Sequence, residues 1–356
     1  MINFRFHVVS IVAVFLALAV GIVLGATELR GKALDALNST SSDLANELNA
    51  AHAQNHTLQQ QVTGDQGFGQ ADMARLLSGL LDNQRVVLVD APGAPGVVIN
   101  GLTAALRQAG ATMTGQVNLQ PKLLDASESN QQFLSTLVQT LASSAAAPSN
   151  GTPLQQAAQL LGGAILTKND PSSNTGSGES STIRQDVLSS YGQAGLLSVS
   201  GPLSVTGQTA APATLAVVVT PAAAPAGGDS DPVNQGLITL AQELDTAGLG
   251  TVVTSSISGS VTGSAINALR SSSAGTQISS VDDTDTVIGQ IVAVQTLAQE
   301  LTGHKPGSYG DGPGASGAGP SPAPTPSPTS STQVTGATTH SRGTTSSGKK
   351  SSKGKT

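Results

Sequence analysis

The chain of 356 residues has no cysteine, no tryptophan and few other aromatic residues, namely five phenylalanines and two tyrosines. The absence of cysteine excludes disulfide bonds and removes the soft thiolate ligands that Cu(I) prefers. Met73 and Met113 remain as candidate thioether ligands, but they lie far apart in the sequence. The scarcity of aromatic residues argues against a membrane β-barrel, because the outer faces of such barrels carry girdles of aromatic side chains.

Charged residues are also scarce, at 11% of the chain, and the two signs are unevenly placed. Residues 1–310 carry 11 Lys and Arg against 21 Asp and Glu, whereas residues 311–356 carry five basic residues and one aspartate. An acidic body offers no basic surface to phosphates, so we predict no nucleic-acid partner. The basic tail, in contrast, suits contacts with anionic cell-wall polymers.

One long apolar segment lies near the N-terminus. Residues 8–26 contain no charged side chain, and as a helix they nearly span the hydrocarbon core of a bilayer and contact membrane lipid. Arg5 precedes the segment and the charges that follow it cancel, so the rest of the chain is expected outside the cytoplasm. The sequence therefore predicts a single-pass anchor over residues 1–27. The alternative is a cleaved signal peptide with its cleavage site near residues 23–25.

A heptad pattern follows the anchor and predicts a coiled coil over residues 28–64. The a positions are 34, 41, 48, 55 and 62, and the d positions are 37, 44, 51 and 58. Leucine at most d positions and Asn55 at an a position favour a parallel dimer. We therefore predict a homodimer or higher homo-oligomer through residues 34–62. The alternative is a single amphipathic helix that packs on its own domain.

Glycines separate this helix from the next part of the chain. Gly64 is predicted to end the helix, and Gly67 and Gly69 are predicted to form a hinge. At the other end of the chain, residues 311–356 are rich in Gly, Pro, Ser and Thr. Such a composition buries too little apolar surface to fold, so these residues are predicted to form a disordered tail.

Beyond residue 81 the pattern changes to alternating strands and helices. The short, continuously apolar runs 85–90, 215–219 and 250–254 are typical of strands that are covered on both faces of a sheet. Further strands are predicted near 112–118 and 277–281, and helices near 97–109, 131–146, 153–166, 233–247 and 286–302. Strand–loop–helix units that recur in this way predict a largely parallel α/β domain over residues 81–304.

Two groups of side chains are weak candidates for a metal site, and no cofactor is predicted. His52 and His56 lie four residues apart, which places them on neighbouring turns of a helix, but most metal sites need three or four ligands. In the heptad register both histidines fall on the solvated side. Asp282, Asp283 and Asp285 could attract a hard cation, although they equally suit a helix N-terminus, with Asp285 as the N-cap.

The loop over residues 90–96 is a third candidate site, because it follows a predicted parallel strand that ends at Asp90. Ligands favour the carboxyl ends of such strands. The loop matches neither the phosphate-binding loop nor the dinucleotide fingerprint, so we interpret it as a structural turn. No serine has a His and Asp context for nucleophilic catalysis, and the sequence does not predict an enzyme.

Two motifs together resemble a known family. The first comprises Arg5, His7, Ser10, residues 13–19, Gly21 and residues 24–25; the second comprises residues 281–286, Gly289, Gln290 and residues 297–298 and 309–310. As a pair they resemble the actinobacterial copper transport outer-membrane protein B family over about residues 1–310.

The resemblance implies a role in copper efflux or homeostasis in the outer membrane or cell envelope, with copper as the transported ion and not as a cofactor. It also implies a channel, which the short apolar strands do not indicate, since membrane barrels need longer strands of alternating polarity. The alternative function is a non-transporting envelope scaffold or binding module with a coiled-coil spacer.

Overall fold

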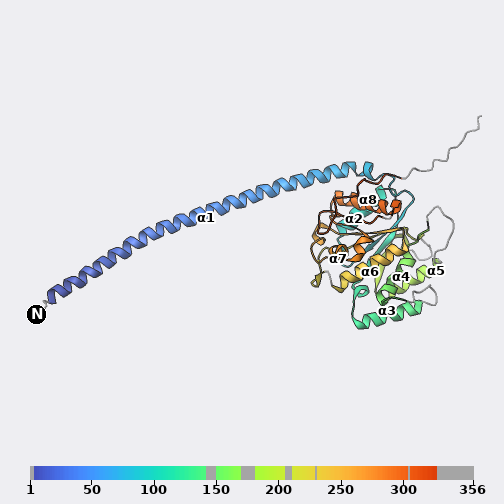
Figure 1. Cartoon of the computed structure of the whole chain (residues 1–356), viewed down its shortest axis with the longest axis horizontal. Helices are drawn as coiled ribbons and strands as arrows, with labels where there is room; N and C mark the ends of the chain where they lie inside the picture. Colours follow the sequence, from blue (N-terminus) through green and yellow to red (C-terminus); the bar gives the residue numbers. More distant parts are fainter. Residues whose placement is uncertain are drawn as a thin grey trace, which may run out of the picture.

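A long helix, α1 (Phe4–Leu77), leads into an α/β domain (Figure 1). The computed structural model describes residues 4–141, 150–169, 181–204, 211–228, 231–303 and 305–326. Helix α1 projects from the domain, and its first turns lie far from the sheet. The predicted order, an apolar N-terminal helix followed by a largely parallel α/β domain, is confirmed.

Seven strands in the described part of the chain form one sheet, in the order β3-β2-β1-β4-β5-β6-β7. They are β1 (Arg85–Asp90), β2 (Thr112–Leu119), β3 (Leu197–Ser200), β4 (Leu215–Val219), β5 (Gly250–Thr254), β6 (Ser279–Val281) and β7 (Ser308–Tyr309). All neighbouring strands run parallel except β2 and β3. Strands β1, β4 and β5 are buried almost throughout, as continuously apolar strands in a covered sheet should be.

Helices cover both faces of the sheet (Figure 1). One layer is formed by the end of α1 with α2 (Gly96–Gln108) and α8 (Val287–Gly303). The other layer is formed by α3 (Glu128–Leu141), α4 (Pro153–Ile165), α5 (Ser181–Gln193), α6 (Pro232–Ala247) and α7 (Ala265–Ser271). Short 3-10 helices span Pro121–Leu124, Gly201–Ser204, Ile257–Gly259 and Ser273–Thr276. The arrangement is a doubly wound sheet with two separate apolar cores.

Helices α5 and α7 and strands β3 and β7 were not predicted from the sequence. Helix α5 is rich in serine and buries only Val187, Leu188 and Tyr191, so its apolar periodicity is weak. Strand β3 is only four residues long, lies at the edge of the sheet and pairs antiparallel with β2. Helix α7 has only seven residues and strand β7 only two. The helix predicted near 131–146 is observed as α3, and residues 142–149 lie outside the described residues.

Helix α1 does not end at Gly64, and the predicted hinge at Gly67 and Gly69 is wrong, because the helix continues without a break to Leu77. Glycine inside a helix costs only about 1 kcal/mol. Contacts with the domain offset this cost, since Met73 and Leu77 are buried in the core beneath α8. The last turns of α1 are therefore part of the domain.

The contact between α1 and α8 explains the glycine at position 69. A Cβ atom on Gly69 would lie 3.1 Å from Cγ1 of Val287, whereas a Cβ atom on Gly67 would meet nothing within 4 Å. Nearby, the side-chain oxygen of Gln66 accepts a hydrogen bond of 2.8 Å from the backbone N–H of Val287, at the start of α8. Gly69 thus permits close approach of two helices and does not act as a hinge.

Replacing Gly69 by leucine is expected to lower the free energy of unfolding by about 1–3 kcal/mol, because the added side chain overpacks the α1–α8 contact. Gly67 lies on the exposed surface of the same helix, so the same substitution there should be neutral or slightly stabilising, because leucine favours a helix more than glycine does. Urea titrations of both variants beside the parent protein measure the difference. Equal effects at the two positions would contradict the packing role of Gly69.

The part of α1 that precedes this contact is not covered by the domain (Figure 1). Its heptad leucines and valine are all more than half exposed: Leu34, Leu37, Leu44, Leu48, Leu58 and Val62. The alternative in which residues 34–62 pack on their own domain is therefore wrong. The predicted coiled coil itself stays a prediction, because the structure contains one copy of the chain.

The predicted tail begins too early at residue 311. After β7, the backbone N–H of Gly310 donates to the carbonyl of Gly317 (3.0 Å), and Ser316 N–H donates to the carbonyl of Ser308 (2.8 Å). The chain stays in contact with the domain beyond this loop, and Pro320 is buried. Backbone hydrogen bonds, which composition does not reveal, hold this apolar-poor segment in place. Residues 327–356 lie outside the described part of the chain.

Candidate functional site

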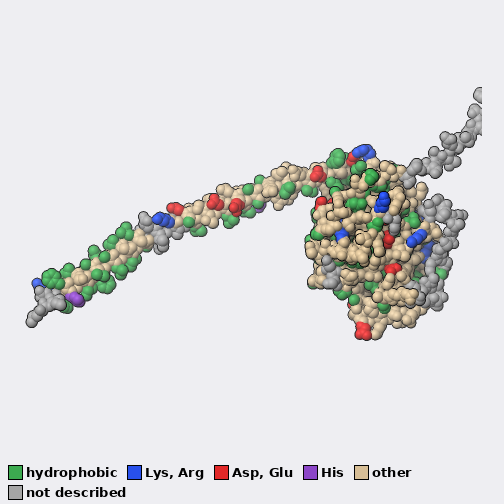
Figure 2. Space-filling view, viewed as in Figure 1, with side chains coloured by type: hydrophobic (Ala, Val, Ile, Leu, Met, Phe, Trp, Pro, Cys, Tyr) green, Lys and Arg blue, Asp and Glu red, His purple; other side chains and the backbone are tan. Residues whose placement is uncertain are grey.

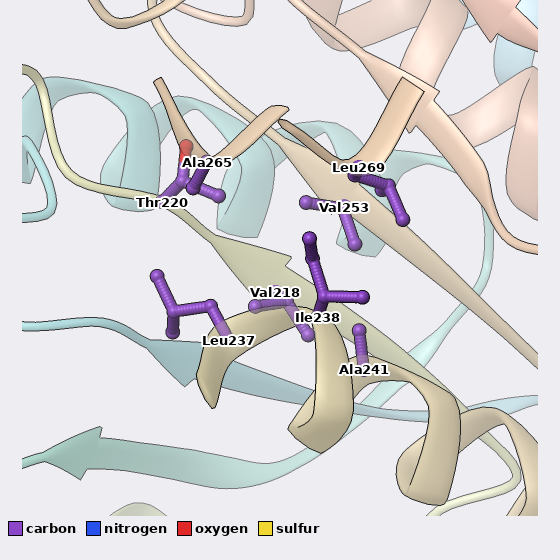
Figure 3. A pocket seen from close by; sticks show the side chains of 8 residues that line it. All are labelled: Val218, Thr220, Leu237, Ile238, Ala241, Val253, Ala265 and Leu269. Carbon is purple, nitrogen blue, oxygen red and sulfur yellow. The ribbon is translucent and has the colours of Figure 1, made fainter. Parts of the chain in front are cut away.

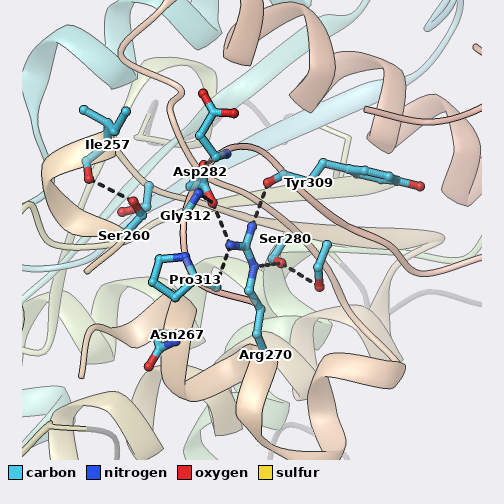
Figure 4. Close-up of polar contacts among 12 residues, drawn as sticks. Ile257, Ser260, Asn267, Arg270, Ser280, Asp282, Tyr309, Gly312 and Pro313 are labelled. Carbon is cyan, nitrogen blue, oxygen red and sulfur yellow. Dashed lines mark hydrogen bonds and ion pairs between the residues drawn. The ribbon is translucent and has the colours of Figure 1, made fainter. Parts of the chain in front are cut away.

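The aspartate-rich motif begins at Asp282, directly after β6, and this residue is the centre of a buried polar cluster (Figure 4). The guanidinium of Arg270, on α7, lies 2.6 Å from Oδ2 of Asp282, and the two side chains are 2% and 0% exposed. Both carboxylate oxygens also accept backbone N–H groups, from Asp311 at 2.7 Å and from Gly312 at 3.0 Å. Asp282 is thus a structural carboxylate with its charge compensated.

Arg270 uses its remaining donors on the same cluster. It donates to the carbonyl oxygens of Tyr309 (2.6 Å) and Pro313 (3.1 Å) and to Oγ of Ser280 (2.9 Å) (Figure 4). We call residues 308–317 the C-terminal segment. Because Arg270 and Asp282 both bind its backbone, this buried ion pair holds the C-terminal segment against β6.

The glycine of the Tyr309–Gly310 motif is required by this packing. Gly310 has a φ of 115°, a backbone conformation that disfavours every residue with a side chain. A Cβ atom there would also overlap Oδ1 of Asp282. The two motifs that the sequence places 27 positions apart, at Asp282 and at Tyr309–Gly310, therefore form one structural unit.

Asp285 is not the N-cap of α8, which corrects the prediction. Its Oδ1 accepts a hydrogen bond of 2.9 Å from the backbone N–H of Ile257 on the neighbouring loop. The cap is Thr286, whose hydroxyl accepts from Gly289 N–H at 3.0 Å. Threonine is also a good N-cap residue, and the long-range contact of Asp285, which sequence cannot show, decides between the two.

Asp283 is the member of the motif with a perturbed acidity. Its φ is 58°, an uncommon value for a residue with a side chain. Burial, together with the nearby carboxylates of Asp282, Asp311 and Asp285, raises the pKa of Asp283 to about 7. The folded protein therefore favours the neutral carboxyl group at this position.

The sign of the pH dependence follows from the raised pKa. The stabilising contribution of neutral Asp283 is fully present below about pH 4 and is lost as the pH rises through about 7. We expect the free energy of unfolding to fall between pH 5 and pH 8, and Asp283→Asn, which stays neutral, to remove about 1–2 kcal/mol of that fall after allowance for solvent screening. Urea titrations at both pH values measure it.

Glu128→Gln makes the same kind of change at an exposed carboxylate on α3 and serves as the control against which the pH profile of Asp283→Asn is compared. Asparagine also tolerates the positive φ at position 283, so the substitution alters charge without straining the backbone. An unchanged profile in Asp283→Asn would show that the carboxyl group is charged in the folded protein.

The predicted metal-site candidates do not converge in the structure. Asp282 is occupied by Arg270 and backbone donors, and Asp285 turns to a different loop. His52 and His56 lie exposed on α1, before the part of this helix that contacts the domain. In the described ranges no group of three or more His, Asp or Glu side chains is placed to hold a metal ion.

The methionines do not form a soft-metal site with these groups. Met73 is 2% exposed within the core formed by α1, α2 and α8. Met113, on β2, is partly buried against the same core. Both side chains serve apolar packing, which is the common use of methionine.

Asp90 lies at the switch point of the sheet, where β1 is flanked by β2 and β4 and the strand order reverses. It is 3% exposed, its Oδ2 accepts from the side-chain amide of Gln116, and its Oδ1 has no hydrogen-bond partner among the described residues. Burial raises the pKa of Asp90 to about 6, against the opposing effect of the Gln116 hydrogen bond. Gln116 also donates to Asn118 at 3.1 Å.

Backbone hydrogen bonds hold the loop that follows Asp90, and its interpretation as a structural turn stays a prediction. Ala94 N–H donates to the Ala91 carbonyl (3.0 Å), and Ala222 N–H donates to the Gly93 carbonyl (3.2 Å), which ties this loop to the one after β4. The pattern alone did not reveal that Asp90 is buried with one free oxygen. The sequence pattern of one aspartate after an apolar strand does not indicate whether that aspartate is buried, because its burial depends on the loops that cover it.

A small cavity lies below this edge of the sheet, between β4, β5, α6 and α7 (Figure 3). Its volume is about 10 Å³, and its lining is apolar apart from Thr220; the other lining residues are Val218, Leu237, Ile238, Ala241, Val253, Ala265 and Leu269. Such a volume is no larger than one water molecule needs. The cavity is a packing defect of the core and does not accommodate a substrate.

One segment of the described chain is long and apolar enough to cross a membrane, Phe4–Ala26, with a mean hydropathy of 2.9. Its side chains are exposed, and apolar groups cover its visible surface (Figure 2). The chain thus combines one membrane-compatible helix with a domain in which Asp282 and Asp285 of the acidic motif make structural contacts.

Residues 1–320 match the family described as "Copper transport outer membrane protein, MctB". The chain is 28% identical over 326 residues to the copper transporter MctB of Mycobacterium bovis and to that of Mycobacterium tuberculosis, covering 88% of this chain and 98% of each relative. It is 30% identical over 328 residues to the copper transporter MctB of Mycobacterium leprae, with the same coverage. The matched range includes α1 with its apolar segment, the α/β domain and the C-terminal segment, and the chain belongs to the MctB family.

Proposed function

We propose that this protein acts in copper efflux or homeostasis as a single-pass, membrane-anchored component of the cell envelope, with its α/β domain outside the cytoplasm. The observation that carries the proposal is the match to copper transporters along the whole folded length, anchor included. Copper is the transported ion in this proposal, not a resident cofactor.

The geometry of α1 supports the anchored arrangement. Phe4–Ala26 suits a bilayer, and the same helix continues to Leu77 without interruption. At 1.5 Å per residue, the part between Ala26 and the first contact with the domain at Gln66 is about 58 Å long, so it can hold the domain well away from the lipid. A continuous helix of this kind favours a retained anchor over a cleaved signal peptide.

One membrane helix per chain cannot enclose an ion pathway by itself. In the described ranges the polar clusters of the domain are used internally, as at Arg270 and Asp282. Transport therefore requires several copies or another membrane protein, and the domain contributes through assembly. The basic residues after position 340 are proposed to contact anionic wall polymers, which would fix the assembly within the envelope.

A strain that lacks the gene tests the function. We expect its growth to be more sensitive to copper and its cellular copper content to rise, and we expect the full-length gene to restore both. A version in which a cleavable signal peptide replaces residues 1–27 should release the domain and fail to restore them. A version with an unrelated single-pass anchor of equal length is the matched control and should succeed.

The second candidate function is an envelope scaffold with a rigid spacer, which the long projecting helix favours. It predicts defects in envelope integrity without a change in copper. Normal copper tolerance and normal copper content in the deletion strain would therefore contradict the transport role and support the scaffold.

A further inference from the structure

The projecting part of α1 carries an apolar stripe that nothing in the single chain covers. Six leucines and valines at the heptad positions of residues 34–62 are between 52% and 66% exposed on one helix. Isolated helices with such a stripe bury it against a partner, because apolar surface exposed to water is unfavourable. We propose that the partner is a second copy of this chain, paired in parallel and in register, with Glu47 of each copy beside His52 of the partner subunit.

The membrane fixes the orientation of the two copies. Both helices leave the bilayer from the same face at Ala26, so their heptads run in the same direction and start at the same height. A parallel in-register pair aligns each a position with itself. Asn55 then meets Asn55 of the partner subunit, where the two amides can bond to each other and disfavour other registers and higher oligomers.

The flanking positions provide the polar complementarity. In a parallel coiled coil, a g residue lies beside the e residue of the next heptad on the partner helix. Glu47 occupies a g position and His52 occupies the following e position. The carboxylate of Glu47 can accept a hydrogen bond from the imidazole, which has an N–H donor in either protonation state.

The remaining flanking positions are compatible with the same pairing. The e positions hold Asn38, Ala45, His52 and Gln59, and the g positions that the structure describes hold Thr40, Glu47, Gln54 and Gln61. No like charges meet in this register, and Glu47 with His52 is the one pair that includes a charged carboxylate. The hydroxyl of Thr40 is already bonded to the carbonyl of Ala36 on its own helix (2.8 Å), so it needs no polar partner.

Cysteine cross-linking tests the pairing, because the chain has no native cysteine. Leu44→Cys lies at a d position, and Ala53→Cys lies at an f position on the outer side of the helix. With the full-length protein in membranes under mild oxidation, we expect disulfide-linked dimers from Leu44→Cys and monomers from Ala53→Cys. An antiparallel pair would not bring position 44 next to itself, so a lack of cross-linking at this position would overturn the proposal.

A charge reversal tests the predicted contact between Glu47 and His52. Glu47→Lys should weaken the dimer of the full-length protein in detergent about five-fold, as measured by analytical ultracentrifugation, because it places a cation beside His52 in two symmetric contacts. Adding His52→Glu should restore the dimer. Asp43→Lys makes the same charge change at a c position, away from the partner, and should have no such effect.

Equal weakening by Glu47→Lys and Asp43→Lys, or a monomeric parent protein at all concentrations, would overturn the pairing. These results are independent of copper, so a failure here is distinguishable from a failure of the proposed function. The double variant Leu44→Asp and Leu48→Asp should give a monomer with an intact α/β domain.

Discussion

Replacing Arg270 by alanine is expected to lower the free energy of unfolding of the α/β domain by about 3–5 kcal/mol, since it removes one partner of a buried ion pair. The carboxyl group of Asp282, which is 0% exposed, would lose its countercharge. The carbonyl groups of Tyr309 and Pro313 would lose their donor as well. This effect exceeds that of a surface substitution by several-fold.

Urea titrations of the full-length protein in detergent micelles measure the loss. Tyr191 and Tyr309 are the two tyrosines of the chain and both lie in the domain, so their near-ultraviolet circular dichroism reports domain unfolding without a contribution from α1. Arg107→Ala, at an exposed arginine in the last turn of α2, is the matched control and should change stability by less than about 0.5 kcal/mol. A loss in Arg270→Ala no larger than that control would show that the ion pair does not stabilise the fold.

Ending the chain at Gly310 is expected to lower the free energy of unfolding by about 3 kcal/mol, whereas ending it at Pro326 should change stability little. The truncation at Gly310 removes the backbone N–H groups of Asp311 and Gly312, which bind the buried carboxylate of Asp282. Hydrogen bonds to charged groups contribute roughly 1.5–3 kcal/mol each, and water replaces part of what is lost.

The two truncations serve as controls for each other, because both remove the basic residues beyond 340. The same tyrosine signal in urea titrations measures stability. Salt extraction from cell-wall material measures retention, which both truncations should weaken equally if the basic residues bind wall polymers. Equal stability of the two truncated proteins would show that the C-terminal segment is dispensable, as composition alone suggests.

Much of the fold was predictable because its signals are local. The apolar runs at 85–90, 215–219 and 250–254 predicted buried parallel strands, and all three were confirmed as β1, β4 and β5. Continuously apolar residues favour a strand that is covered on both faces, and this preference does not depend on the rest of the sequence. Weak local patterns failed, as in the serine-rich helix α5.

The candidate site was less predictable, because its meaning depends on partners distant in the sequence. The sequence pattern indicated a helix terminus or a cation site at Asp282, Asp283 and Asp285. In the structure, each of these carboxyl groups has a different environment. Asp282 binds Arg270 and the C-terminal segment, Asp285 binds the Ile257 loop, and Asp283 is left with a raised pKa. Long-range contacts of this kind leave no trace in local composition.

The sequence by itself determined the long apolar helix at Phe4–Ala26, the alternation of strands and helices, and the heptad spacing of α1, because hydrophobicity and its period act over a few residues. Only the tertiary structure decided that α1 continues through Gly64, Gly67 and Gly69 into the domain and that the C-terminal segment folds. At both ends of the domain, burial and backbone hydrogen bonds with distant residues outweigh the local preference for a turn or a coil.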